Sequence, residues 1–279
     1  MEDQRSRNGL WPRQTQFQST ALVWIATPLL AFSALYPLIR ASSVEAWILP
    51  VSISLAFGLA ARWAKAATLP AAAIGFLVCL TITGPAVQRQ IGLSGTALPA
   101  LITLVLLTSL ATRFGRSKKE AHHLAERREG RRASQIAANL SVAALCSAFG
   151  WHLASIAALA EAAADTASSE VGQAIGGRVW LLTSWRRVPI GTDGGVSLAG
   201  SSAGILAAAI VVGAGMVPQM PWPDAAIAFA SACAALFFDS LLGATVENRG
   251  WLGNDLVNLC STSFSAVVAE AILAILKRP

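Results

Sequence analysis

The run LAGSSAGILAAAIVVGAGMV, residues 198–217, contains no charged residue. An α-helix of this length rises about 30 Å, which is the thickness of the hydrocarbon core of a bilayer. Other uncharged runs of roughly 16 to 22 residues lie between the charge clusters of the chain, each about long enough to cross a membrane. We therefore expect an all-α integral membrane protein, a polytopic helical bundle with about nine transmembrane helices.

The composition agrees with a membrane protein. Hydrophobic residues make up 54% of the chain and charged residues 13%, whereas a soluble domain is about 25% charged. Basic residues beside membrane spans usually set topology, so the net charge of +6 does not indicate nucleic acid, and we expect no nucleic acid partner. The four cysteines lie singly in separate apolar runs, which gives no zinc-ligand spacing and no disulfide framework.

The charges also predict a topology. The expected spans cover residues 20–39, 46–61, 67–85, 96–112, 134–149, 151–168, 198–217, 225–246 and 256–276. With a cytoplasmic N-terminus, seventeen of the 21 lysines and arginines fall on the cytoplasmic side, as the positive-inside rule requires. The fifth and sixth spans are short, and one long tilted helix is the alternative. We expect the protein in the inner (plasma) membrane of a bacterium.

Three regions follow from this pattern: an N-terminal four-helix membrane region (1–112), a basic cytoplasmic loop (113–133) and a C-terminal catalytic membrane region (134–279). Residues 113–132 of the loop carry eight basic and three acidic residues. Such a loop usually sets topology near anionic lipids, and steering of a phosphate is the alternative interpretation.

Polar residues interrupt the later apolar runs at three places. They are Glu161, Asp165 and Glu170 in AEAAADTASSEVG; Asp239 in FFDSLLGATVENRG; and Asn254, Asp255 and Asn258 in GNDLVNLCSTS. Carboxylates inside membrane spans are costly and usually mark function. Glu161 and Asp165 are four residues apart, on one face of a helix. Asn254 and Asp255 have a simpler alternative as helix caps. In the nine-span topology all three places converge on the cytoplasmic side.

The loop RRVPIGTDGGVS, residues 186–197, faces the same side. Its glycines Gly191, Gly194 and Gly195 let a ligand approach the backbone, and a span whose N-terminal N–H groups point to the cytoplasm follows. Arg186 and Arg187 add fork-shaped donors for phosphate. This arrangement predicts an anion site opposite carboxylates, and Mg²⁺ commonly joins carboxylate to phosphate oxygens. A simple turn is the alternative for GTDGG alone.

Several of these segments resemble the transmembrane protein 19 family, which includes the phytyl-phosphate kinases of plants and cyanobacteria. The resemblance lies in DTASSEVG, RRVPIGTDGGVSLAG and DSLLGATVENRG followed by NDLVNLCST, and it covers roughly residues 120–279. GRRASQIAANLS resembles the basic segment that leads into the family's Q-x-x-A-N turn, which places Gln135 and Asn139.

The resemblance implies a CTP-dependent kinase that phosphorylates a prenyl monophosphate, of the phytyl or geranylgeranyl type, to the diphosphate in contact with membrane lipids. From the resemblance and the chemistry of the loop together, we assign the following residues: Asp165, Asp193 and Asp239 for catalysis; Arg186, Arg187, Gly191, Thr192, Gly194, Gly195, Asn139 and Ser169 for the nucleotide and its phosphates; Asp165, Glu170, Asp239 and Asp255 for Mg²⁺; and Asn254 and Asn258 as further polar site residues.

Two other classes of function stay open at this point. Carboxylates in the membrane and a helix N-terminus also suit a transporter of an organic or phosphorylated anion. A non-catalytic membrane scaffold is the third class. A transporter needs polar residues that reach both faces of the membrane, and the outer half of this chain has few of them.

Overall fold

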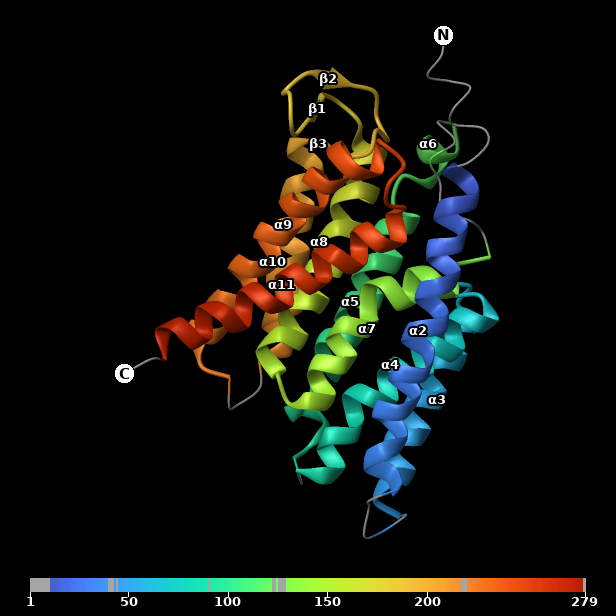
Figure 1. Ribbon diagram of the computed structural model, residues 1–279, viewed down its shortest axis with the longest axis vertical. Helices are drawn as coiled ribbons and strands as arrows, with labels where there is room; N and C mark the ends of the chain where they lie inside the picture. Colours follow the sequence, from blue (N-terminus) through green and yellow to red (C-terminus); the bar gives the residue numbers. More distant parts are fainter. Residues whose placement is uncertain are drawn as a thin grey trace.

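The computed structural model describes residues 11–39, 43, 45–89, 91–121, 124, 129–216 and 220–277. Within these residues, nine long helices form one bundle (Figure 1). They are α2 (Trp11–Ile39), α3 (Ile48–Trp63), α4 (Leu69–Gln88), α5 (Leu98–Arg113), α7 (Ala133–Phe149), α8 (His152–Ile175), α9 (Leu198–Gly215), α10 (Trp222–Leu242) and α11 (Asn254–Leu276). Shorter pieces are α6 (Arg116–Ala121), the 3-10 turns Glu45–Trp47 and Leu93–Gly95, and a π-helical turn, Gly243–Glu247.

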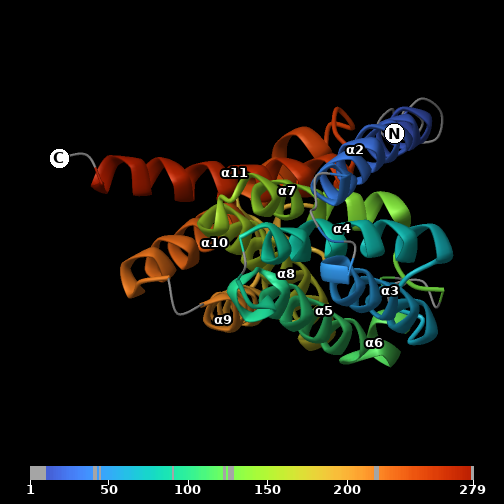
Figure 2. The same ribbon diagram turned by 90° about the horizontal axis from the view of Figure 1, so that it is seen from below.

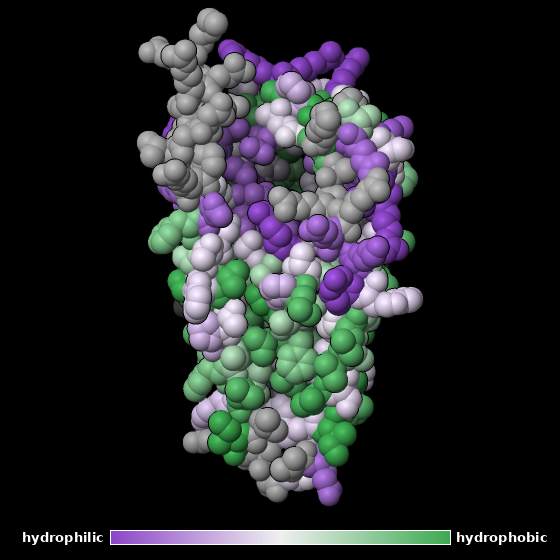
Figure 3. Space-filling view, turned by 90° about the vertical axis from the view of Figure 1, so that its right-hand side faces the viewer, coloured by the Kyte–Doolittle hydropathy of each residue, from purple (hydrophilic) through white to green (hydrophobic). Residues whose placement is uncertain are grey.

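The expected helical membrane bundle is confirmed. By length and composition, helices α2, α3, α4, α9, α10 and α11 can each cross a membrane, and α5 and α7 are shorter apolar helices. In the space-filling view, polar side chains gather at one end of the molecule and hydrophobic side chains form a belt below them (Figure 3). We call this end, which carries α6 and the 176–197 loop, the polar end (Figure 1).

Two helices, α7 and α8, occupy the segment for which one long helix was the alternative. Gly150 ends α7 in the left-handed conformation, with φ +84°, which glycine adopts without steric cost. The N–H of Trp151 donates to the carbonyl of Cys146 at 2.8 Å, and the chain reverses. The single-helix alternative is therefore wrong, and the loops before α7 and after α8 lie at the same end (Figure 1).

Helix α8 is the centre of the bundle. It packs against α5, α7, α9, α10 and α11, and the view along the bundle shows it among them (Figure 2). All its side chains from Leu153 to Ala164 are buried. Helix α9 comes very close to it, because a Cβ added at Gly200 or Gly204 would lie 2.7 Å from a backbone oxygen of α8. Small residues at such contacts are the usual way for membrane helices to pack.

A small antiparallel sheet, which the sequence did not lead us to expect, lies at the polar end over α8 and α9 (Figure 1). Its strands are β1 (Val179–Leu181), β2 (Arg187–Val188) and β3 (Gly195–Val196), in the order β2-β1-β3. Trp180 is opposite Arg187 on one side and Val196 on the other. The sheet holds the 186–197 loop against the bundle.

Local signals explain where several helices begin. Proline occupies the first turn of α4, α5 and α10, where its missing N–H is not needed. At the start of α7, Gln135 Oε1 accepts from the N–H of Arg132 at 2.7 Å, which is the half of a capping box that a glutamine at this position supplies. Gln135, which the Q-x-x-A-N motif includes, therefore fixes the entry into α7.

The polar end is expected to face the cytoplasm, since most basic residues gather there. A cysteine introduced at exposed Ser184, between β1 and β2, should react with a membrane-impermeant maleimide only after the cells are permeabilised. A cysteine at exposed Ser94, near the opposite end of the bundle, is the matched control and should react in intact cells. The reverse labelling pattern would invert the proposed topology.

Candidate functional site

Three carboxylates meet inside the bundle: Glu161 is buried, and Asp165 and Asp239 are half-buried. Glu161 and Asp165 of α8 and Asp239 of α10 are close enough to interact electrostatically. Glu161 Oε1 and Asp239 Oδ2 are buried and have no hydrogen-bond partner among the described residues. The hydroxyl of Ser261 on α11 lies within reach of both side chains. The structure thus brings Asp165 and Asp239 together in a cluster of negative charge, with Arg131 the cation that interacts with Asp165.

Glu247 extends this cluster toward the surface. It ends the π-helical turn after α10 and interacts electrostatically with Asp193, Asp165 and Asp255. We did not single out Glu247 from the sequence, although it lies in the motif segment DSLLGATVENRG. The π-helical turn is the feature that marks Glu247 as a candidate site residue, because such turns are frequent at functional sites. Sequence periodicity alone does not predict one.

Arg131 supplies positive charge next to the carboxylates. It interacts electrostatically with Asp165, and its Nη2 donates to Thr166 Oγ1 at 3.5 Å. Its backbone is fixed as well, because its N–H donates to Ala66 O and its carbonyl accepts from Thr68 N–H, both at 3.0 Å. The basic loop before α7 therefore contributes a defined residue to the site.

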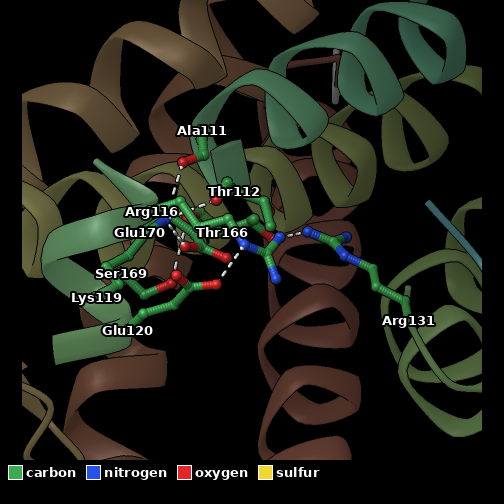
Figure 4. A network of polar contacts seen from close by, with 9 residues as sticks. All are labelled: Ala111, Thr112, Arg116, Lys119, Glu120, Arg131, Thr166, Ser169 and Glu170. Atoms are coloured by element: carbon green, nitrogen blue, oxygen red, sulfur yellow. Dashed lines mark hydrogen bonds and ion pairs between the residues drawn. The ribbon is translucent and has the colours of Figure 1, made fainter. Parts of the chain in front are cut away.

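Glu170, one of the predicted Mg²⁺ ligands, is engaged in a different contact. Its carboxylate forms a buried ion pair with Lys119 of α6. The Lys119 ammonium also donates to the carbonyls of Ala111 and Thr112, at 3.2 and 2.8 Å, at the end of α5 (Figure 4). Ser169, beside it, donates its hydroxyl to Thr166 O at 3.2 Å. Through Lys119, Glu170 thus links α6 and the end of α5 to α8.

The predicted polar residues of α7 and α11 meet in the interior. Asn258 Nδ2 donates to Asn139 Oδ1 at 2.9 Å, and both side chains are buried. Asp255, in the first turn of α11, accepts a hydrogen bond from the Ser19 hydroxyl of α2. Asn254, the first residue of α11, is exposed. The amide pair joins two helices that flank the carboxylate cluster.

The glycine loop packs on the π-helical turn. Gly194 has φ +73°, and an added Cβ would lie 2.2 Å from the backbone nitrogen of Ala244. Asn248 Nδ2 donates to the carbonyl of Asp193 at 3.1 Å. The N–H of Gly195 donates to the carbonyl of Thr192 at 2.9 Å, so this amide is occupied. Close packing against Ala244 is therefore enough to explain why residue 194 is a glycine, without a bound ligand.

The remaining loop residues lie farther out. Arg186 and Arg187 are exposed on the sheet at the polar end. Thr192 Oγ1 donates to Pro189 O at 2.8 Å, and Gly191 has φ +83° beside Leu124. Their contact with nucleotide phosphates stays a prediction.

Two hollows open near the carboxylates. The first, of about 570 Å³, lies between α3, α4, α5, α7 and α8 and reaches Asn139 and Ala162. The second, of about 850 Å³, lies between α2, the start of α7, the turn after α10 and the start of α11. Polar side chains in the second include Thr15, Ser19, Arg132, Glu247 and Asp255. Asp165 interacts with Arg131, which lines the first hollow, and with Glu247, which lines the second.

The site offers few ligands for a metal ion by itself. Among the described residues, no group of three or more histidine, cysteine, aspartate or glutamate side chains is arranged to hold a metal. Mg²⁺ needs fewer protein ligands, because it is usually bound by one or two carboxylates together with waters and substrate phosphates. Asp165 and Asp239, with the unpaired oxygens around them, fit that kind of site.

Comparison with known proteins identifies relatives across most of the chain. The model of the family described as "Integral membrane protein DUF92" matches residues 52–266, which confirms the family resemblance of the motifs. Protein VTE6, chloroplastic, from Arabidopsis thaliana is 30% identical over 67% of this chain and 61% of its own length. Two further relatives are described as uncharacterized membrane proteins. The protein sll0875 of Synechocystis is 36% identical over 60% of this chain and 69% of its own length. The protein MJ0933 of Methanocaldococcus jannaschii is 31% identical over 62% of this chain and 74% of its own length. No solved structure matches.

Proposed function

The chain belongs to the DUF92 family of integral membrane proteins, and from this membership and the site above we propose that it is a prenyl-phosphate kinase. It transfers the terminal phosphoryl group of a nucleoside triphosphate, CTP in our proposal, to a prenyl monophosphate of the phytyl or geranylgeranyl type. The reaction takes place at the cytoplasmic face of a bacterial plasma membrane. The resemblance of the motifs around Asp165, Asp193 and Asp239 to those of phytyl-phosphate kinases supports this choice of reaction.

The observation that carries the proposal is the pair of unpaired, buried carboxylate oxygens on Glu161 and Asp239. Burying charged oxygens is costly unless a cation or hydrogen bonds balance them. Asp165 adds a third carboxylate to the same place. A site of this composition is suited to a bound cation that accompanies an anionic substrate.

Mg²⁺ is the cation that fits. Asp165 and Asp239 would hold it, and it would supply positive charge that neutralises the phosphate oxygens during transfer. We leave Glu170 and Asp255 out of this ligand set, because their carboxylates already accept from Lys119 and Ser19.

The protein itself has mainly to position the two substrates. The acceptor phosphate is already ionised, so its attack requires no strong base, and charge stabilisation and alignment account for most of the catalysis. The guanidinium of Arg131 holds the acceptor phosphate next to Asp165, since its planar fork suits phosphate oxygens. An acceptor oxygen then bonds to the terminal phosphorus of the donor while the bridging oxygen–phosphorus bond breaks and the nucleoside diphosphate leaves.

We place the donor nucleotide in the second hollow instead of against the 186–197 loop, because no residue of that loop, which the structure describes in full, lines the hollow. Helices α7 and α11 both begin there, and helix N-termini favour anions through free N–H groups and the helix dipole. Glu247 connects this hollow electrostatically to Asp165. The donor and the acceptor thus approach the carboxylate cluster from two sides.

The direct test is an assay of the purified protein in detergent with Mg²⁺, CTP labelled in its terminal phosphate, and phytyl, geranylgeranyl and farnesyl monophosphates. We expect labelled prenyl diphosphate, with less product when ATP or GTP replaces CTP and none when Mg²⁺ is chelated. A protein that transfers no label from any nucleotide, and that instead moves an organic anion across a vesicle membrane, would be a transporter.

A further inference from the structure

The first hollow has apolar walls and a basic mouth. Its deeper lining is mostly apolar, from Phe57 of α3, Gly75 of α4, Leu104 of α5, Leu140 of α7 and Ala162 of α8, with Thr108 of α5 and Asn139 of α7 as polar members. Its polar-end lining carries Lys65, Arg113, Arg116 and Arg131, with Glu120 the acidic residue among the lining side chains that the structure describes. We call these four cations the basic collar. A cavity with an apolar interior and a basic mouth suits a ligand that has one anionic head and a hydrocarbon tail.

The geometry of the collar favours a phosphate group. The guanidinium groups of Arg116 and Arg131 come from different elements and point toward one another, as Figure 4 shows. Arg116 is paired with Glu120 at 3.1 Å and Arg131 contacts Thr166, which fixes both side chains. Two guanidinium forks in this position can hold the oxygens of one phosphate from opposite sides.

The depth of the cavity is set by the same helices. On α5, Leu104 lies nine residues before Arg113, which is about 13 Å along a helix. Gly75 lines the cavity opposite Phe57, and a Cβ built on it would already touch the Phe57 ring at 3.5 Å. A leucine side chain at this position would therefore narrow the cavity between α3 and α4, either directly or by displacing the ring of Phe57.

We infer that this cavity is the acceptor subsite, which takes a single-chain isoprenyl monophosphate with its tail beside Gly75 and its phosphate in the basic collar. The inference rests on the proposed function and adds to it where the acceptor binds and what limits its length. Arg131 then brings the acceptor phosphate to Asp165, because this arginine lines the cavity and interacts with that carboxylate.

Binding without nucleotide or Mg²⁺ tests the inference independently of catalysis. The probes are radiolabelled geranyl, farnesyl and geranylgeranyl monophosphate, with farnesol, inorganic phosphate and phosphatidic acid as competitors. We expect the prenyl monophosphates to bind and the three competitors to displace them poorly. Gly75→Leu should weaken the binding of geranylgeranyl monophosphate by about tenfold or more, since an apolar pocket discriminates by this amount for one added or missing apolar group. It should affect the binding of geranyl monophosphate much less.

Three further variants keep the test decisive. Gly213→Leu is the matched control, because a Cβ on this membrane-helix glycine meets nothing within 4 Å, and it should bind like the wild type. Val105→Phe fills the cavity from α5 and should repeat the chain-length effect if Gly75→Leu does not fold. Arg116→Gln should weaken all prenyl monophosphates and leave any binding of farnesol unchanged.

The inference fails if Gly75→Leu and Val105→Phe leave the chain-length dependence unchanged, or if phosphatidic acid competes as well as the prenyl monophosphates do. The second outcome would make the cavity a site for a bilayer lipid. Chain-length-dependent binding without any phosphoryl transfer would instead leave the acceptor subsite in place and contradict the kinase proposal.

Discussion

Replacing Asp239 by asparagine is expected to lower the rate of phosphoryl transfer by about two to three orders of magnitude while the protein stays folded. The substitution keeps the shape of the side chain and removes its charge, and with it the carboxylate that we assign to Mg²⁺. The fold should tolerate the change, because it removes one of several like charges in a buried cluster. The rate is measured with labelled CTP, and folding is followed by thermal unfolding in detergent.

The same helix offers a matched control. Asp224 lies in the first turn of α10, at the opposite end from Asp239, and its Oδ2 lies 3.9 Å from the Lys277 ammonium. Asp224→Asn should transfer phosphate at the wild-type rate. Near-normal turnover of Asp239→Asn would rule out its metal role, and equal losses in both variants would indicate a general effect on α10.

The membrane helices were predictable from the sequence because length and apolarity determine them. Residues 198–217 were expected to form a span, and α9 covers Leu198–Gly215. The meeting of Asp165 with Asp239 agrees with the expected convergence of the polar clusters, whereas the hydrogen bond between Asn139 and Asn258 was not predicted. The chemistry of these residue types is distinctive in a membrane, where each polar group needs a partner.

Other parts of the site leave no such signal. The strands of the small sheet are two or three residues long, too short for a periodic pattern. Gly194 illustrates a second limit, because approach of a ligand and packing against Ala244 both require the absence of a Cβ. Sequence reasoning assigned it to a phosphate, and the structure provides a packing reason.

The first hollow, which we assign to the acceptor, was not predicted from the sequence for a third reason. Its walls on α3, α4 and α5 are made largely of alanine and other apolar residues with no chemical motif. They come from the four-helix region, whereas the recognisable motifs lie in the second half of the chain. Only the packing of α3, α4 and α5 beside α7 and α8 brings that lining next to the carboxylates.

Lys119→Met is expected to lower the free energy of unfolding by about 3–5 kcal/mol, because it leaves the Glu170 carboxylate buried without its cation. Lys119 is fully buried and also holds the end of α5 through the Ala111 and Thr112 carbonyls. Thermal unfolding of the purified protein and its yield from the membrane measure the effect.

Lys118→Met, at the exposed neighbouring position, is the control and should be as stable as the wild type. Combining Lys119→Met with Glu170→Gln should restore much of the stability, since the uncompensated charge is then gone and only polar contacts are lost. A metal-binding Glu170 would give the opposite pattern: Lys119→Met would be stable, and the double variant would keep its fold and lose Mg²⁺-dependent activity. The two variants therefore decide whether the DTASSEVG motif ends in a structural ion pair, as its contacts with α5 and α6 indicate, or in a ligand of the site.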